Sequence, residues 1–510
     1  MSRDDTESGN STTWGRADRW ALIAIVLVAS VFRLWNLSHP PELIFDETYY
    51  AKDACWYVLH EPDVCQRDAS APEVHPPLGK WLIAIGIRIW GFDCPNPDDA
   101  CSGATTTFGW RILPAIAGIA TVALLYLLAR RLFRSTLAAS IAAGLLALDF
   151  LHLVQSRTSM LEIFVPLFGL AGILFLVYDR DQREREPGKS MLERPWLLAA
   201  GVALGAATAT KWSGALYLLA GAAVAIGLAV GLHRRRGEPW LRGALRAEAF
   251  PLVLYLVIAP LFIYLLTYIG RIEGSLFALP WSPGSWLRSL WDHHNYMVDF
   301  HTGLESNHSY QSPPWTWILL KRPVSYYFCS DECGGDYQEI FAAGNPFVWW
   351  TSLLALAYVA WRWVRERGRA EAIILGGFLL TYVPWLISDA RTHRPAVFIF
   401  YLLPTIPFMC LALAYVATRI GRSWEATSAI GLFAVGTAGV FAFYLPLLLG
   451  TSLPVNEWDA RIWVFDNCDK PVGTTVTSTV EETIGGNVQT RVVQTTSDTS
   501  SIPPTGWCWI

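Results

Sequence analysis

The sequence predicts an all-α polytopic membrane protein, because of its composition and its repeated apolar runs. Of 510 residues, 53% are hydrophobic, only 16% are charged and 25 are tryptophan. A soluble chain with so few charged groups could not cover itself with polar surface. The apolar runs recur at lengths near the roughly 20 residues that cross a bilayer as a helix. The net charge of −4 gives no indication of nucleic-acid binding.

About eleven of these runs are candidate transmembrane helices. The first run is long for the core of a signal peptide and no small-residue cleavage site follows it, so it is predicted to be a retained span. The remaining runs continue to the last quarter of the chain. The eleven are residues 20–37, 108–132, 137–151, 163–178, 196–210, 215–232, 250–268, 347–364, 372–387, 396–416 and 428–449.

The distribution of arginine predicts the orientation in the cell membrane. With a cytoplasmic N-terminus, every inner loop carries clustered arginines and the C-terminus lies outside, as the positive-inside rule requires. The chain then divides into a disordered cytoplasmic tail (1–19), a transmembrane domain (20–450) and a Thr-rich extracytoplasmic tail (451–510). The inner loops are 130–135, 179–195, 233–246, 365–370 and 418–424, and the long outer loops are 38–107 and 270–344.

Two stretches of the outer loops are predicted to lie in the plane of the membrane. Residues 78–92 are apolar but short, and Lys80 and Arg88 interrupt them, which fits an amphipathic in-plane helix better than a span. Residues 285–304 place their apolar and histidine side chains on one helical face. That face comprises Leu287, Leu290, His294, Met297, His301 and Leu304.

Eight of the nine cysteines fall on the predicted outer side. An even number in an oxidising compartment favours disulfides. A zinc site at Cys329 and Cys333 with nearby histidines is the alternative, but the spacing is poor for zinc. Cys410 lies in a predicted span and should be a free thiol. The predicted disulfides are Cys55–Cys65, Cys94–Cys101, Cys329–Cys333 and Cys468–Cys508.

The outer tail carries an alternating pattern on both sides of residues 485–487, which read Gly-Gly-Asn. This pattern is typical of a small β-hairpin. A disordered Thr/Ser-rich tail would have a similar composition and is the alternative. The predicted Cys468–Cys508 disulfide favours the hairpin.

The stretch PELIFDETYYAKD, residues 41–53, carries the candidate catalytic group. Asp46 and Glu47 come soon after the first span, among Phe45, Tyr49 and Tyr50. Adjacent acids before a helix can simply cap its N-terminus. Their position at a membrane exit, together with the cations that follow along the chain, favours a catalytic base on the outer side.

Basic residues recur at the predicted outer ends of the helices. Any one of them could extend its charge to the membrane surface, and we accept that interpretation for Arg88. Together, opposite a retained Asp-Glu pair, they predict an anion site, and a phosphate group suits guanidinium and ammonium groups. They are His75, Lys80, Arg111, Arg157, Lys211, Arg391 and Arg394.

A polar groove for the acceptor is predicted in the second outer loop. His308, Tyr310 and Ser312 occur there in the sequence NHSYQS. Helix packing is an equally simple role for these three side chains. Histidines 294, 301 and 308 recur every seven residues, a spacing that is not a metal-binding signature.

Several motifs together resemble the protein O-mannosyltransferases, membrane enzymes that use a polyprenyl phosphate mannose donor. The actinobacterial branch is the most similar. The resemblance implies the GT-C fold of multispanning, lipid-dependent glycosyltransferases, with two in-plane helices in the first outer loop. The motifs occur in the family's order between residues 20 and 449, and they are FDETYYAKDA, HPPLGK, TKWSG, HSYQS, AAGNPFVWW and FYLLPTIPF.

This resemblance implies roles for single residues. Asp46 would be the catalytic base and Glu47 its partner, and Arg111 would lie near the donor phosphate. The HPPLGK motif carries over as His75 and Lys80. A protein acceptor would receive mannose from the lipid donor, with inversion, on a Ser or Thr hydroxyl at the outer face of the membrane.

The chain also departs from the family pattern. Glu162 stands where many relatives have Asp, and we place it with Tyr50 in the substrate groove. Eukaryotic members carry a β-trefoil MIR domain in the second outer loop, for which this loop is too short. The tail with Cys468 and Cys508 differs from the short tails expected of bacterial relatives.

The expected mechanism needs no metal and no other cofactor. Asp46 would take the proton of the attacking hydroxyl, and cationic side chains would stabilise the charge that grows on the leaving phosphate. The predicted donor-phosphate residues are Arg111, His75, Lys80, Lys211 and Arg394.

The expected partners are the lipid donor, exported Ser/Thr-containing polypeptides, membrane lipid and the secretion channel. One alternative is a related transferase that glycosylates a lipid or a glycan. A transporter or lipid flippase is a second alternative, but the sequence shows no internal repeat and most ionisable groups lie at outer helix ends.

Overall fold

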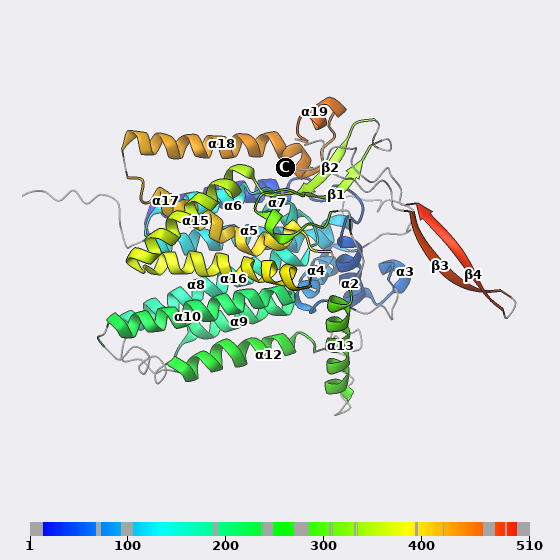
Figure 1. Ribbon diagram of the computed structural model, residues 1–510, viewed down its shortest axis with the longest axis horizontal. Helices are drawn as coiled ribbons and strands as arrows, with labels where there is room; N and C mark the ends of the chain where they lie inside the picture. Colours follow the sequence, from blue (N-terminus) through cyan, green and yellow to red (C-terminus); the bar gives the residue numbers. More distant parts are fainter. Residues whose placement is uncertain are drawn as a thin grey trace, which may run out of the picture.

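A computed structural model shows a bundle of long helices whose axes follow the long axis of the molecule, with short helices and strands gathered at one end (Figure 1). The hairpin β3–β4 extends from that end, away from the bundle. The structure describes residues 14–67, 73–92, 106–186, 192–235, 237, 248–269, 285–304, 308, 310–330, 333, 335–392, 396–421, 423–462, 475–484 and 487–496.

The predicted all-α membrane class is confirmed, and each of the eleven apolar runs lies mainly in helix. Within the described residues, seven helices are long and apolar enough to cross a membrane, or eight if one bent pair is a single span. The other three predicted spans are α1, α9 and α15. They were predicted as spans because each contains an apolar run, but α9 has only 16 residues and α1 holds buried Asp18 and Arg33.

The bundle consists of α1 (Arg16–Leu34), α5 (Thr106–Phe133), α6 (Thr136–Ala147), α7 (Phe150–Arg157), α8 (Phe164–Arg185), α9 (Pro195–Thr210), α10 (Ala215–Arg235), the π-turn Leu254–Ile258 with α12 (Ala259–Leu266), α15 (Pro346–Glu366), α16 (Arg369–Thr392), α17 (Ile406–Ala417) and α18 (Trp424–Leu449).

A break between α6 and α7 turns the chain by 59° inside the bundle. Asp149 begins α7 by accepting a hydrogen bond from the backbone N–H of His152 (2.9 Å), and its other oxygen accepts from Trp349 Nε1 (2.8 Å). Arg33 of α1 donates to His152 Nδ1 (2.8 Å) and to Ser156 Oγ (3.3 Å). These bonds fix α7, whose C-terminal end leads directly to the site described below.

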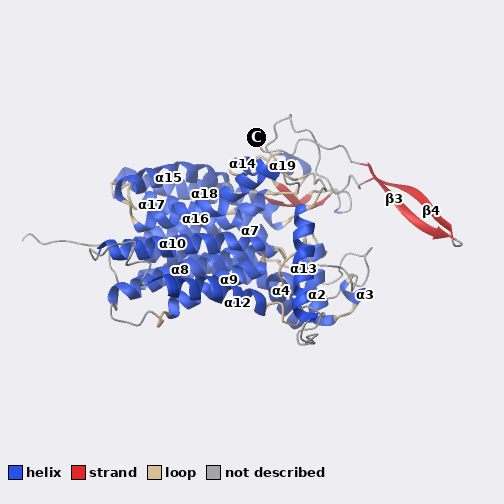
Figure 2. Ribbon diagram, turned by 60° about the horizontal axis from the view of Figure 1, so that its bottom comes forward, coloured by secondary structure: helices blue, strands red, loops and turns tan. Residues whose placement is uncertain are grey.

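Short elements cover one end of the bundle (Figures 1 and 2). Among them, α13 runs across the direction of the long helices, in agreement with the predicted in-plane helix at 285–304. The strands β1 and β2 form an antiparallel pair. These elements are α2 (Glu47–Leu59), α3 (Pro62–Cys65), α4 (Leu78–Trp90), α13 (Ser285–Thr302), α14 (Pro314–Trp317), β1 (Val324–Cys329), β2 (Gln338–Ala342) and α19 (Val455–Asp459), with 3-10 turns at Leu161–Ile163, Trp212–Gly214 and Ile399–Thr405 in the bundle beneath them.

Arginines tie helix ends together at the opposite end of the bundle. Asp181 at the end of α8 pairs with Arg131 of α5 (2.5 Å) and with Arg369 at the start of α16 (2.7 Å). Arg130 pairs with Asp18 at the start of α1 (2.6 Å). The arginine-rich loops and the Asp46 region therefore lie at opposite ends of the molecule.

Two of the four predicted disulfides are present in the described part of the chain, Cys55–Cys65 and Cys329–Cys333. The sulfurs of Cys329 and Cys333 are bonded to each other, which contradicts the zinc alternative. Cys410 is buried and free, as predicted. The other two predicted pairs, Cys94–Cys101 and Cys468–Cys508, lie outside the described residues.

The predicted hairpin in the tail is confirmed. Strand β3 (Thr475–Ile484) pairs antiparallel with β4 (Asn487–Thr496) along their whole length, from Ile484 opposite Asn487 to Thr475 opposite Thr496. In Figure 1 this hairpin projects away from the helical bundle.

Candidate active site

Asp46 begins α2, but its side chain does not cap that helix. Its carboxylate instead accepts a hydrogen bond from the hydroxyl of Tyr50, one turn further along. Phe45, just before it, has a positive φ of 48°, a conformation that non-glycine residues seldom adopt. The capping alternative therefore does not describe Asp46, and its carboxylate is available for another role.

Burial, and after it the negative charge of Glu162, raise the pKa of the Asp46 carboxyl to about 7. The positive charge of Lys211 and the hydrogen bond from Tyr50 act in the opposite direction. Glu162 and Lys211 form an ion pair with each other, and both are buried. A carboxylate with a pKa near neutrality is suited to take and release a proton.

The Glu162–Lys211 pair comes from two separate helix junctions. Glu162 lies in the 3-10 turn that joins α7 to α8, and Lys211 lies between α9 and the turn Trp212–Gly214. The Lys211 ammonium also sits 5.0 Å from the centre of the Tyr401 ring, a distance at which the ring's face attracts a cation.

An aromatic wall stands beside these charges. The Phe45 ring stacks on Tyr326 of β1, with centroids 4.4 Å apart and planes only 7° from parallel. Phe400 packs edge-on against Phe45 (5.7 Å), and His308 also lies edge-on to it (6.0 Å). The Tyr326 hydroxyl accepts a hydrogen bond from Gln155 Nε2 (2.6 Å).

Two buried acceptor atoms in this cluster have no hydrogen-bond partner: Glu162 Oε2 and Gln155 Oε1. A buried unpaired acceptor costs roughly 1–3 kcal/mol. Both residues belong to the cluster around Tyr326, because Gln155 bonds its hydroxyl and the charge of Glu162 acts on it. The site can therefore accept hydrogen bonds from a ligand that carries hydroxyl groups.

Glu47 points away from this cluster and is clamped by Arg111 of α5. The guanidinium donates to both carboxylate oxygens, at 2.9 and 2.7 Å, and neither side chain is exposed. The backbone N–H groups of Ile44 and Ser159 also donate to the carboxylate, at 3.1 and 2.8 Å. Glu47 thus joins the start of α2 to α5 and to the chain after α7.

Arg111 uses its remaining donors on backbone carbonyls. Its terminal nitrogens reach the oxygens of Pro40 and Glu42, both at 2.8 Å, and of Leu37 at 3.4 Å. All three guanidinium nitrogens therefore have acceptors within the protein. Its predicted contact with a donor phosphate stays a prediction, and in this geometry the clamp on Glu47 is its observed role.

Lys80 is likewise occupied. Its ammonium pairs with Asp53 (2.6 Å) and with Glu73 (2.8 Å), and it is almost completely buried. Arg67 pairs with Asp53 (2.6 Å), and the Cys55–Cys65 disulfide precedes Arg67 by two residues. This buried network holds α2, α3 and α4 together.

His75 lies between the site and α13. Its ring is 5.8 Å from that of Tyr50 and stacks on His301 at 5.1 Å. His301 in turn contacts Trp212, the neighbour of Lys211, at 5.7 Å, and bonds the carbonyl of Val74 (2.7 Å). Helix α13 therefore closes over the side of the site formed by Tyr50 and Lys211.

The predicted acceptor groove is only partly assembled around Asp46. His308 reaches the aromatic wall, as described above. Tyr310 and Ser325 share a hydrogen bond between their hydroxyls. Ser312 is buried and accepts from Trp317 Nε1 (3.1 Å), which is the packing role that the sequence left open.

The structure divides the predicted set of cations. Lys211 acts directly on Asp46, and His75 lies behind Tyr50. Arg157 donates to the last carbonyls of α1, including that of Trp35 at 2.7 Å, and Arg391 is exposed. Arg394 lies outside the described residues. The observed role of Arg157 is to bond these carbonyls, and the convergence of all these cations on one anion site stays a prediction.

Four residues of the cluster were not among the sequence candidates: Gln155, Tyr326, Phe400 and Tyr401. Gln155 stands two positions before Arg157, and Tyr401 lies within the quoted motif FYLLPTIPF. No pattern marked Tyr326, because a tyrosine in a short strand is ordinary. Only the three-dimensional arrangement identifies it.

Two family models cover most of the chain. The model described as dolichyl-phosphate-mannose-protein mannosyltransferase matches residues 23–271. The model of the C-terminal four-transmembrane region of protein O-mannosyltransferase matches residues 286–466. Together they include every residue of the site described above.

Relatives over nearly the full length carry the same description. A polyprenol-phosphate-mannose–protein mannosyltransferase of Mycobacterium tuberculosis is 32% identical over 506 residues, covering 88% of this chain and 93% of that protein. The protein of the same name in Corynebacterium glutamicum is 27% identical, with 88% and 94% covered.

Solved structures show the same fold at low identity. The S. cerevisiae protein O-mannosyltransferase Pmt1–Pmt2 complex bound to the sugar donor gives a TM-score of 0.70 at 16% identity, covering 89% of this chain and 93% of that one. ArnT from Cupriavidus metallidurans gives 0.52 at 18% identity, covering 84% and 65%. The predicted GT-C architecture is thereby confirmed.

Proposed function

The chain belongs to the protein O-mannosyltransferase family, and on this premise we propose that it transfers mannose from a polyprenyl phosphate donor to Ser or Thr hydroxyls of proteins. The state of the Asp46 carboxyl is the single observation on which the proposal rests. This carboxyl makes no capping hydrogen bond to α2, and burial and the charge of Glu162 raise its pKa to about 7.

In the proposed reaction the acceptor hydroxyl oxygen attacks the anomeric carbon of mannose. The bond from that carbon to the phosphate oxygen breaks, and the hydroxyl proton passes to Asp46. The polyprenyl phosphate leaves as an anion, so it needs no proton. A single in-line displacement inverts the anomeric centre, and a β-linked donor gives an α-linked product.

Lys211 is the residue best placed to stabilise the leaving phosphate. Its charge acts on Asp46, and the Tyr401 face and Glu162 hold it in the same cluster. Fixed positive charge is most effective where negative charge develops in a site that excludes water. His75 would lie on the same side, while Lys80 and Arg111 would support the site through their ion pairs.

Glu162 Oε2 and Gln155 Oε1 would accept hydrogen bonds from sugar hydroxyls. Each hydrogen bond from the sugar to one of these two atoms would favour binding, because it would remove the free-energy cost of a buried unpaired acceptor. The aromatic wall of Phe45 and Tyr326 would offer an apolar face beside them.

Orientation and partners extend the proposal. The arginine-rich end would face the cytoplasm by the positive-inside rule, which would put Asp46 on the outer side of the cell membrane, where exported polypeptides and the secretion channel would meet it. The scheme requires no metal or cofactor, because the phosphate is a stable leaving group and Lys211 can balance its charge.

A product assay tests the reaction itself. Purified protein, incubated with radiolabelled polyprenyl phosphate mannose and a Thr-rich peptide, is expected to place label on the peptide. The matched control is the same peptide with every Ser and Thr replaced by Ala or Val, which should stay unlabelled. Label that appears only in the lipid extract, or in a glycan, would contradict the protein acceptor.

The pH profile tests the charges around Asp46. Since the base must be ionised, transfer should rise with pH through about 7 and then level off. Glu162→Gln removes a negative charge that raises the pKa of Asp46, so the midpoint should move to lower pH. Lys211→Met removes a charge that lowers it, so the midpoint should move to higher pH. Each shift is expected to be about one unit.

The opposite directions make this test independent of general loss of activity. Glu61→Gln, an exposed acid at the same end, is the control and should leave the midpoint in place. Midpoints that move together, or that stay where the wild type has them, would show that Asp46 is not the titrating group.

A further inference from the structure

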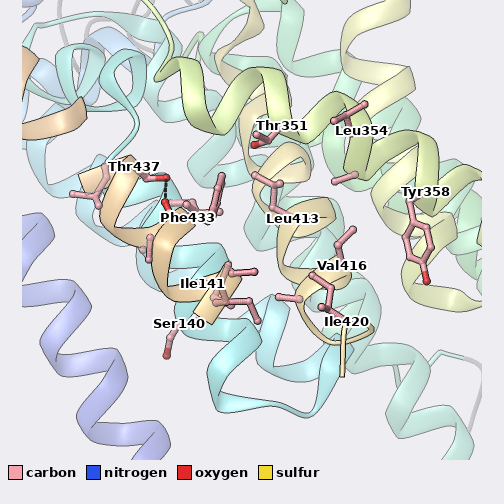
Figure 3. A pocket seen from close by; sticks show the side chains of 18 residues that line it. Ser140, Ile141, Thr351, Leu354, Tyr358, Leu413, Val416, Ile420, Phe433 and Thr437 are labelled. Carbon is pink, nitrogen blue, oxygen red and sulfur yellow. Dashed lines mark hydrogen bonds between the residues drawn. The ribbon is translucent and has the colours of Figure 1, made fainter. Parts of the chain in front are cut away.

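A separate cavity of about 590 Å³ lies among α6, α15, α17 and α18 (Figure 3), and none of its lining residues belongs to the site described above. Its wall is almost entirely aliphatic and aromatic. Leu413 and Val416 of α17 face Phe433 of α18 across it. Ala429 to Thr437 of α18 line it over a rise of about 12 Å, close to the hydrocarbon depth of one leaflet, which is half of about 30 Å.

Three hydroxyl groups of this wall, those of Thr437, Ser140 and Thr351, already donate hydrogen bonds to backbone carbonyls. Thr437 donates to the carbonyl of Phe433 in its own helix (2.9 Å), as Figure 3 shows. Ser140 donates to Thr136 (2.8 Å), and Thr351 donates to Phe347. An occupant therefore finds hydrocarbon contacts and no free polar partner among these three side chains.

A hydrogen-bonded bridge lies at the end of the cavity nearer to the site, beside the lining residues Leu148 and Thr437. Asn345 Nδ2 donates to the carbonyl of Leu148 (3.3 Å) and to that of Thr437 (3.4 Å). This bridge joins the α6–α7 break to α18. An acyl chain that enters the cavity from the arginine-rich end would meet this bridge at the far end.

At its other end the apolar cavity adjoins a second, more polar one of about 710 Å³. The two share Ala417 and Ile430 as lining residues. The second cavity is lined by Arg419, which is exposed and stacks on Tyr415 (5.1 Å). Arg419 is the one charged residue among the side chains that line it, and none of them is acidic.

We propose that these joined cavities bind one anionic phospholipid of the leaflet at the arginine-rich end. An acyl chain fills the apolar cavity, and the phosphate headgroup lies in the polar one against Arg419. Basic pockets between membrane helices bind anionic lipid headgroups for this reason. A cation at one end of an apolar cavity, with a hydrogen-bonded bridge at the other, matches a lipid with one polar end.

The donor lipid is the other amphiphile in this system, and the geometry argues against it here. Its phosphate must reach Asp46, whereas Arg419 stands at the opposite end of the bundle. The Asn345 bridge separates the apolar cavity from the active site. The exclusion of the donor lipid rests on the proposed function, whereas the binding of an anionic phospholipid does not.

Native mass spectrometry of the full-length protein in detergent, with added dioleoyl phosphatidylglycerol or dioleoyl phosphatidylcholine, tests the site. The wild type should bind one phosphatidylglycerol more tightly than phosphatidylcholine. Arg419→Gln should weaken phosphatidylglycerol binding about fivefold, the effect of one basic residue at a membrane surface. Arg88→Gln, which changes an exposed arginine at the other end of the molecule, should not.

A second variant tests the slot itself. A Cβ at Gly144 meets no atom within 4 Å, and Gly144 lines the cavity, so Gly144→Leu fills it without a clash at the first carbon. Gly227 of α10 is equally open and gives the matched control Gly227→Leu. Gly144→Leu should reduce binding of both lipids, while the control should not.

Two results would overturn the proposal. One is equal retention of phosphatidylglycerol and phosphatidylcholine by the wild type, by Arg419→Gln and by Gly144→Leu. The other is displacement of phosphatidylglycerol by undecaprenyl phosphate at equal concentration, since that would make the cavity a donor site.

Discussion

Replacing Asp46 with asparagine is expected to lower the rate of mannose transfer by about 10²- to 10⁴-fold, the usual contribution of a general base. The amide has nearly the same shape as the carboxylate but cannot take the proton of the attacking hydroxyl. The fold should persist, because the Asp46 side chain does not cap α2 and its hydrogen bond comes from Tyr50 alone among the interactions resolved around it. Loss of activity should therefore occur in a protein of normal stability.

The measurement is the initial rate of peptide labelling at saturating donor, together with thermal unfolding of the same preparation. Asp63→Asn is the matched control, since Asp63 is an exposed acid in the nearby helix α3. It should leave the rate unchanged. An Asp46→Asn protein that transfers mannose as fast as the wild type would remove Asp46 from the mechanism.

Features governed by local pattern could be predicted from the sequence. Apolar runs gave the helices because a bilayer span needs a nearly uninterrupted apolar stretch. The pairs Cys55–Cys65 and Cys329–Cys333 could be predicted because their members are close in the chain. The hairpin at 475–496 followed from alternation on both sides of a turn.

The partners of the charged groups could not be predicted in this way. The sequence predicts on which side of the membrane a cation at a helix end lies. It does not predict the partner of that cation, because the partner depends on which helix packs beside it. Arg157 donates hydrogen bonds to backbone carbonyls around the end of α1, such as that of Trp35. Lys80 forms ion pairs with Asp53 and Glu73. The α6–α7 break, which brings Gln155 beside Tyr326, was contained in one predicted span of 137–151.

Arg111→Ala is expected to destabilise the protein by about 3–5 kcal/mol, the cost of leaving one member of a buried ion pair without its partner. Glu47 would keep two backbone donors but lose both guanidinium bonds. The carbonyls of Pro40 and Glu42 would also lose their donors. Arg111→Lys should restore little, because an ammonium cannot reproduce the two parallel bonds and the contacts to these carbonyls.

The same variant separates two roles for Arg111. If the arginine serves as a clamp, Arg111→Ala and Glu47→Gln should both lower the unfolding temperature, and the double variant should be less destabilised than the sum of the two. If it binds the donor phosphate, Arg111→Ala should raise the KM for the lipid donor at unchanged stability, and Glu47→Gln should not reproduce that effect. Arg88→Ala, at an exposed position of α4, controls for the loss of an arginine.

Every guanidinium nitrogen of Arg111 already has an acceptor within the protein. Arg111 could therefore bind a donor phosphate only by breaking the contacts that hold α2 to α5. We therefore expect the stability change to dominate.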